Sequence, residues 1–258
     1  VQFDLFGWPL DDDLDSESVF TELSRHTSLK SLELGSASSH HRQCFRFPGQ
    51  TFSGMKDLTF LTLRECLQKD ACLALKEPLL ASPNLLALNL SNNEGGNELA
   101  FMLADVLKVC SRLQDLSLMN NCITDEGACQ LAISCPSTLS VLDLSHNLLT
   151  SAGANRMVEI LHQTMQFERR SCACTTCAEG TMTTSGRDHY LFLEDNHFID
   201  AATASTLEQQ FPWVYLGAFN PPVYNPVTDT EWRWFAARRT ENEEREHAEQ
   251  DEEEEDNG

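Results

Sequence analysis

The sequence predicts a curved α/β solenoid in which parallel strands line the concave face and helices cover the convex face. Two observations carry this prediction. The pattern Leu-x-x-Leu-x-Leu occurs five times, with starts 26 to 29 residues apart, and helix-start residues follow the later copies. A repeat of this length holds one strand and one helix, and stacked copies bury a shared apolar core. The five copies start at Leu29, Leu58, Leu85, Leu113 and Leu139.

Each copy of the pattern fits a short strand followed by a tight turn. Three residues past the last leucine, the sequence places Asn93, Asn121 and Asn147 in three copies and Cys66 in another. We expect the asparagine to hydrogen-bond backbone groups of the turn that would otherwise lack partners inside the solenoid. A cysteine is small and bonds weakly, so Cys66 fits the same position.

The segments after Asn121 and Asn147 contain Ile-Thr-Asp-Glu-Gly-Ala and Leu-Thr-Ser-Ala-Gly-Ala. Threonine is favoured as a helix N-cap, and Ala128, Leu131 and Ala132 then recur at helical spacing on the inner side. With the strand patterns, these segments resemble leucine-rich repeats of the ribonuclease-inhibitor-like subclass. The resemblance covers about 1–219 and implies a protein-binding role. The same repeat occurs in Ran GTPase-activating proteins, tropomodulin-like actin cappers and NLR receptors.

Weaker copies extend the array in both directions. Leu191 and Leu193 lead to Asn196, and we expect a helix over 199–207 and a terminal strand over 211–216. At the other end, Phe3 and Leu5 lie 29 residues before the corresponding leucines of the first full copy. The sequence therefore predicts about eight strands. The chain begins inside a repeat and without a methionine, so we expect a fragment or a processed chain.

The array is interrupted between Leu139 and Asp188, a step of 49 residues. The extra segment, about 167–187, is rich in Gly, Ser and Thr, so we expect an inserted loop. Zinc binding by Cys172, Cys174 and Cys177, with His189 or His162 as the fourth ligand, is one alternative, and an oxidisable loop is another. The spacing C-x-C-x-x-C is not typical of zinc sites and no second pair exists, so we expect a mobile loop and no metal.

Side chains between the leucines point out of the solenoid, because successive residues of a strand alternate between its faces. On this outward face three carboxylates lie on neighbouring strands: Asp115, Asp143 and Glu194. Solubility explains such a group by itself, and a docking point for Lys or Arg of a partner is the functional alternative.

Four aromatic residues share the outward face of the last two predicted strands: Tyr190, Phe192, Trp213 and Tyr215. The leucine core does not need them, and aromatic clusters often anchor protein interfaces. The segment 220–239, which includes Trp232, Trp234 and Phe235, offers a second explanation. It could fold back over the four aromatics as a C-terminal cap, since terminal repeats need covering.

The chain carries a net charge of −22. Residues 240–258 hold eleven acidic residues and one Arg, so we expect a disordered acidic tail there. Such a negative surface repels phosphate backbones, which argues against nucleic acid and favours a basic protein partner. No apolar run is long enough to span a bilayer and no secretory signal is present, so we expect neither a membrane role nor export.

Six of the ten cysteines lie inside the repeats, where we expect thiols to act as small apolar fillers. Paired cap cysteines are absent, so we expect a reducing compartment, the cytosol or the nucleus.

No P-loop, nucleophile elbow, zinc-protease motif or dinucleotide fingerprint occurs, so we expect no enzyme activity and no cofactor. The alternative is a Ran-directed GTPase-activating protein, which resembles this layout of repeats followed by an acidic stretch. This chain departs from that layout in its Cys-rich insertion and its smaller number of repeats.

Overall fold

The computed structural model describes residues 2–6, 25–35, 56–67, 69–169, 189–211 and 213–217, with the backbone alone for 2–6, 69–71 and 165–169. The described strands form one eight-stranded parallel sheet whose spatial order follows the chain. The strands are β1 (Gln2–Phe6), β2 (Ser31–Gly35), β3 (Phe60–Arg64), β4 (Ala87–Asn89), β5 (Asp115–Ser117), β6 (Val141–Asp143), β7 (Tyr190–Phe192) and β8 (Val214–Tyr215). Eight strands were predicted, and this is confirmed.

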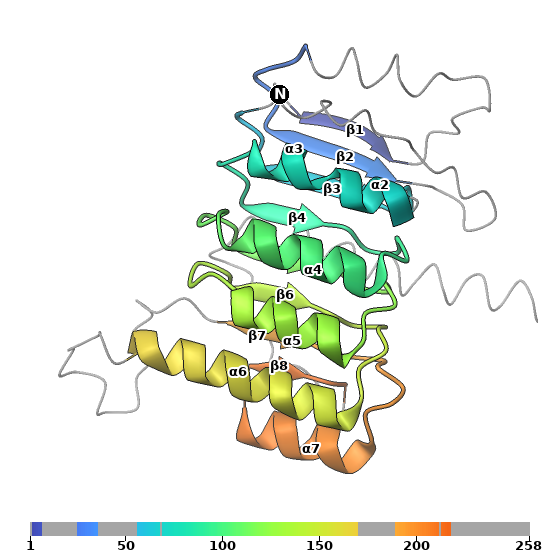
Figure 1. The fold of residues 1–258 in the computed structure, drawn as a ribbon, viewed down its shortest axis with the longest axis vertical. Coiled ribbons are helices and arrows are strands. Elements are labelled where there is room, and N and C mark those ends of the chain that lie inside the picture. The colour runs from blue at the N-terminus through green and yellow to red at the C-terminus, as the bar shows by residue number, and fades with distance from the viewer. Residues whose placement is uncertain are drawn as a thin grey trace, which may run out of the picture. The chain divides into compact units, whose positions relative to one another are not determined.

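Among the described residues, each strand from β3 to β7 is followed by at least one helix. Those of the described residues are α2 (Lys69–Ala74), α3 (Lys76–Leu80), α4 (Gly96–Leu107), α5 (Asp125–Ser134), α6 (Ser151–Arg169) and α7 (Ala201–Gln210). Figure 1 shows them stacked on one side of the sheet. Pro78 has no N–H to donate to the Ala74 carbonyl, which accounts for the break between α2 and α3. None of these helices has the length and apolar character needed to cross a bilayer.

The strand register is the one that the leucine spacing predicts. The second leucine of each pattern forms a continuous column through Leu32, Leu61, Leu88, Leu116, Leu142, Leu191 and Val214. At the first edge Phe3 pairs with Leu32 and Leu5 pairs with Leu34, so β1 continues the array as predicted. The last strand is shorter than the predicted 211–216, because only Val214 and Tyr215 are in strand conformation.

The core lies between the sheet and the helices. In the repeat that contains β5, Leu116 and Leu118 are 0% exposed. Ala128, Leu131 and Ala132 on the inner side of α5 are 0% exposed as well. Full burial of one leucine side chain stabilises a fold by roughly 1.5–3 kcal/mol. Because leucines recur in every layer, the core is continuous along the array, and no single repeat could bury its face alone.

Each predicted turn asparagine bonds to the neighbouring repeat. The Nδ2 group of Asn147 donates to the Leu118 and Leu144 carbonyls, both at 3.0 Å. Its Oδ1 atom accepts from the backbone N–H groups of Asn121 and Ile123 at 3.0 and 2.9 Å. Asn93, Asn121 and Asn196 bond in the same way to N–H and carbonyl groups of the repeat that precedes each of them. The expectation that this residue satisfies buried turn groups is therefore confirmed.

Cys66 takes the asparagine position in β3's turn. Its thiol donates weakly to the Leu34 carbonyl, with an Sγ–O distance of 3.7 Å. The expectation of buried, apolar thiols is correct for Cys66, Cys72 and Cys110, and wrong for Cys122. Cys122 directly follows a turn asparagine and has a φ of +58°, and its side chain is exposed.

Two predicted boundaries are wrong. Helix α6 continues to Arg169, into the segment 167–187 that we expected to be a loop. Helix α7 begins at Ala201 rather than 199, because Asp200 is its N-cap and accepts the Thr203 N–H at 2.9 Å. The chain divides into two units, 1–219 and 220–258. The rest of the insertion, the expected cap segment 220–239 and the acidic tail lie outside the described residues.

Candidate functional site

We define the ladder face as the face of the sheet formed by side chains that alternate with the buried leucines. Its first column contains Ser31, Phe60, Ala87, Asp115, Val141 and Tyr190. Its second column contains Glu33, Thr62, Asn89, Ser117, Asp143, Phe192 and Tyr215. The second column is the one predicted from the leucine spacing, whereas the first was predicted to continue to Trp213 and ends at Tyr190, because β8 begins only at Val214.

Three of the four predicted aromatic residues form one stack on the ladder face. The ring of Tyr215 lies 6.0 Å from that of Tyr190 and 5.1 Å from that of Phe192, with interplanar angles of 29° and 23°. These distances are typical of favourable ring pairs. Tyr215 is 8% exposed, whereas Tyr190 and Phe192 are half-buried. We call Tyr190, Phe192 and Tyr215 the aromatic stack.

Trp213 does not belong to this stack, which corrects the prediction. It precedes β8 and packs against the core. Its ring contacts that of Phe211 at 5.7 Å, and Phe211 in turn contacts the His162 ring at 5.1 Å. The strict alternation assumed from the sequence therefore ends one residue before the strand, where the chain leaves α7. This second cluster joins α6 to the segment that follows α7, and the repeat pattern gave no signal for it.

Two of the predicted carboxylates, Asp115 and Asp143, lie on adjacent strands of the ladder face, and Glu194 lies in the turn after β7. Asp143 is fixed by two hydrogen bonds: its Oδ2 accepts from the Ser117 hydroxyl at 3.1 Å and its Oδ1 from the Ser145 N–H at 3.0 Å. The Ser117 hydroxyl also lies 2.9 Å from that of Ser91, which links β4, β5 and β6. Asp115 and Glu194 are half-buried. The geometry therefore holds at least one carboxylate in a defined position.

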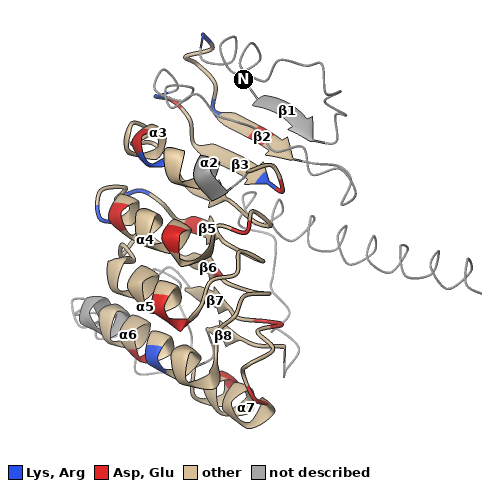
Figure 2. Ribbon diagram, turned by 45° about the vertical axis from the view of Figure 1, so that its right-hand side comes forward, with Lys and Arg blue, Asp and Glu red and all other residues tan. Residues whose placement is uncertain are grey.

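Negative charge alone does not mark the site. Figure 2 shows acidic residues on α4, α5 and α7, on the other side of the sheet. One of them, Asp105 on α4, lies 2.9 Å from Lys76 and 3.2 Å from Lys108. These two ammonium groups hold the pKa of the Asp105 carboxyl below its usual value. What distinguishes the ladder face is the combination of carboxylates with the aromatic stack.

Much of the ladder face is shielded from solvent. Val141 is 1% exposed and Ser117 is 2% exposed, although both point away from the leucine core. No residue of either column within the described strands is fully exposed. The described part of this face is therefore largely shielded from solvent within the chain itself. The segment 220–239, which we expected either to cap the aromatics or to leave them open, lies outside the described residues.

The zinc alternative falls partly outside the described residues, since Cys172, Cys174 and Cys177 are not among them. His189 is described, and its Nδ1 lies 2.8 Å from the Leu139 carbonyl. Within the described part of the chain, no group of three or more side chains is arranged to hold a metal ion.

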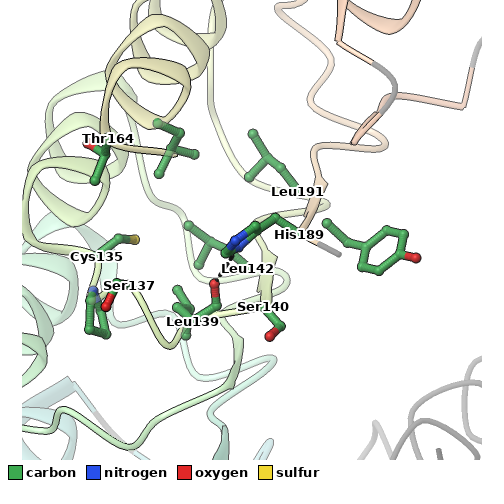
Figure 3. A pocket seen from close by; sticks show the side chains of 11 residues that line it. Cys135, Ser137, Leu139, Ser140, Leu142, Thr164, His189 and Leu191 are labelled. Atoms are coloured by element: carbon green, nitrogen blue, oxygen red, sulfur yellow. Dashed lines mark hydrogen bonds between the residues drawn. The ribbon is translucent and has the colours of Figure 1, made fainter. Parts of the chain in front are cut away.

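An apolar hollow marks the interruption of the array (Figure 3). It lies between α6 and strands β6 and β7, has a cavity volume of about 40 Å³, is partly open to solvent, and is lined by Leu139, Leu142, Leu161 and Leu191. His189 and Cys135 line it as well, and burial raises the pKa of the Cys135 thiol to about 12. Leu161 and Thr164 form the α6 side of the hollow.

Comparison with known proteins supports the fold. A family model described as Leucine Rich repeat matches residues 109–132 and 135–157, the repeats that contain β5 and β6. The fold is a leucine-rich-repeat solenoid. No curated protein sequence matches the chain. Among solved structures, the tropomodulin C-terminal domain of Caenorhabditis elegans is similar over 61% of this chain and 96% of that domain, at 17% identity and a TM-score of 0.44. A likeness at this level supports no functional comparison.

Proposed function

We propose that this chain is a non-catalytic protein-interaction module that binds a protein partner on its ladder face. Leucine-rich repeats typically mediate protein–protein interaction, which supports this function. The observation that carries it is the aromatic stack, whose rings lie on the side of the sheet away from the leucine core. Large rigid aromatic side chains are enriched among the residues that dominate interface energetics.

The finer assignments rest on separate observations. The ribonuclease-inhibitor-like subclass is supported by the Thr and Gly-Ala positions at the starts of α5 and α6. A basic partner is supported by the net charge of −22 and by the ladder-face carboxylates. A reducing compartment, the cytosol or the nucleus, is supported by the free state of the six described cysteines.

A photo-crosslinking residue at Met119, on the ladder face of the repeat that contains β5, tests the proposed function. The matched control carries the same residue at Glu126, which is exposed in the first turn of α5. We expect one protein adduct from position 119, identified by mass spectrometry, and none from position 126. The adduct should be lost when Phe192→Ala is added. Equal adducts from both positions would show that binding does not use the ladder face.

The GTPase-activating alternative gains no support from the described residues. It makes a separate prediction, an increased rate of GTP hydrolysis when the chain is added to a Ran-type GTPase. An unchanged rate would remove this alternative and leave the binding module unaffected.

A further inference from the structure

A backbone hydrogen bond recurs at the third leucine of the repeats from β4 to β7. The N–H of this leucine donates to a carbonyl of the next strand, in the pairs Leu90 with Ser117, Leu118 with Asp143, Leu144 with Phe192, and Leu193 with Tyr215. Each of these strands therefore relies on the following strand to satisfy this N–H group. The last strand, β8, has no following strand among the described residues.

Leu216 stands at this position in the last repeat. It follows Tyr215, which pairs with Phe192, so it takes the place of Leu193 one strand further along. Its backbone N–H donates to the Oε1 atom of Glu208 on α7 at 2.5 Å. The side chain of Glu208 thus supplies the acceptor that the carbonyl of a ninth strand would supply.

A second N–H group at the end of the sheet is also satisfied within the last repeat. Val214 pairs with Leu191, and the Leu191 N–H donates to the Trp213 carbonyl of the next repeat at 2.8 Å. By the same pattern the Val214 N–H would donate to a further strand, and it donates instead to the Phe211 carbonyl at 2.9 Å. The two N–H groups through which β8 could pair with another strand are therefore bonded locally.

The position of the Glu208 carboxylate is not explained by stability alone. Its second oxygen, Oε2, is buried and accepts no hydrogen bond within the described part of the chain. A buried acceptor without a donor is unfavourable, and such an atom in a folded protein calls for an explanation. An unpaired sheet edge supplies one, because it is a template for pairing with another chain, and proteins often block it.

We propose that Glu208 closes the last edge of the sheet and thereby prevents a second copy of this chain from adding a strand to β8. Without this carboxylate the Leu216 N–H has lost its acceptor, and a carbonyl of a strand from a second copy can take its place. The chain then associates with itself through β8. This inference is independent of partner binding on the ladder face, because it concerns the edge of the sheet.

Sedimentation velocity over a range of concentrations measures self-association of the full chain and its variants. Glu208→Ala removes the acceptor, whereas Glu208→Gln keeps an oxygen that can accept the Leu216 N–H. Glu159→Ala is the matched control, because Glu159 is exposed on α6 and its loss changes the net charge equally. Adding Leu216→Pro to Glu208→Ala removes the N–H group itself.

Two further measurements separate pairing from a loss of structure. Thermal melting of each variant checks that it remains folded. If Glu208→Ala unfolds, Glu208→Met replaces it, because methionine fills a similar space and offers no carboxylate acceptor. Hydrogen exchange of the Leu216 amide reports whether its hydrogen bond is present.

We expect Glu208→Ala to associate about tenfold more tightly than the unchanged chain, which corresponds to about 1.4 kcal/mol. Glu208→Gln, Glu159→Ala and the double variant should behave like the unchanged chain. The inference is overturned if Glu208→Ala associates no more than Glu159→Ala, or if the double variant associates as tightly as Glu208→Ala. Faster exchange of the Leu216 amide without self-association would also overturn it, since Glu208 would then only stabilise the end of β8.

Discussion

Asp125, in the first turn of α5, accepts two hydrogen bonds from Thr150, the residue that precedes α6. The Thr150 backbone N–H donates to Oδ1 at 2.7 Å and its hydroxyl donates to Oδ2 at 2.6 Å. A carboxylate of one repeat thus fixes the helix start of the next. Gly153 lies against this carboxyl group, and a Cβ atom at position 153 would overlap it. The Gly-Ala pair recognised in the sequence therefore provides space for a polar contact between repeats.

The same relation links other repeats. Asn97 accepts the Thr124 N–H at 2.9 Å and donates to its hydroxyl at 2.8 Å. Ser151 and Asp200 bond to each other at the start of α7. Threonine was expected to cap its own helix, and Thr150 does so, since its hydroxyl accepts the Gly153 N–H at 3.3 Å. The Thr124 side chain makes no such bond to α5 and bonds to the preceding repeat instead.

Gly153→Ala should destabilise the protein by about 2–3 kcal/mol, because the new methyl group displaces the Asp125 carboxylate from Thr150. In an Asp125→Ala background the same substitution should cost less, because the carboxylate is gone and only the Cβ atom of residue 125, 2.7 Å from the added methyl group, still has to shift. Urea denaturation of the four proteins in this cycle measures both costs. Equal costs in both backgrounds would show that the methyl group collides with something other than the carboxylate.

Asn147→Ala should destabilise the protein by about 3 kcal/mol, because buried carbonyl and N–H groups of two repeats lose their partner. Asn147→Cys should recover part of this loss, since Cys66 serves in the same position. Asn155→Ala is the matched control, because Asn155 is exposed and its amide bonds only to the Ser151 carbonyl within its own helix. Urea denaturation midpoints rank the stabilities of the three variants. If Asn147→Cys is no more stable than Asn147→Ala, the role assigned to Cys66 is contradicted.

Trp213→Ala should lower the stability by about 2 kcal/mol, because the ring packs against the core and the Phe211 ring. Phe198→Ala serves as the control, since Phe198 is 62% exposed and its loss should change stability by less than about 0.5 kcal/mol. Thermal melting distinguishes them. An unchanged melting temperature for Trp213→Ala would mean that Trp213 is a surface residue, as the strand alternation had suggested.

Stability at low pH should depend on Asp200. Hydrogen bonds from Ser151 and Thr203 lower the pKa of this carboxyl to about 2, against about 3.9 in an unfolded chain. Because this pKa is lower in the folded state than in the unfolded chain, the charged carboxylate stabilises the protein above about pH 4. This stabilisation is lost as the pH falls from about 4 to about 2. Asp200→Asn should therefore flatten the decline of the melting temperature over this range. An equal decline in Asp200→Asn and in the unchanged protein would show that these hydrogen bonds do not favour the charged carboxylate.

The described cysteines should differ in their rates of alkylation. Cys122 is exposed and should react first with iodoacetamide at pH 7.5. Cys135 should react much more slowly, because burial raises its pKa to about 12 and keeps it protonated. Peptide mapping by mass spectrometry at successive times gives the order. Faster labelling of Cys135 than of Cys122 would contradict the environment described for either thiol.

The spacing of leucines and asparagines was sufficient to predict eight strands, their register, the inner side of α5 and the bonding of the turn asparagines. It also placed Tyr190, Phe192 and Tyr215 on one face and Asp115 beside Asp143. These features follow from short-range periodicity, because alternation along a strand and a fixed repeat length together determine which residues become neighbours. The Gly-Ala pair at the start of α6 was also evident in the sequence. The contact of Gly153 with Asp125 was not, because it joins residues of different repeats.

Other features were decided only by the tertiary structure. Trp213 turns toward Phe211 and the core instead of joining Tyr215, Cys122 is exposed although its repeat is buried, and α6 continues past the expected boundary. Each of these depends on how the chain enters or leaves a regular element, where periodicity no longer constrains it. Val141 and Ser117, by contrast, lie within strands, and their burial on the ladder face depends on contacts that the repeat pattern does not specify. The sequence states which way a side chain points, whereas its exposure depends on the atoms that surround it in space.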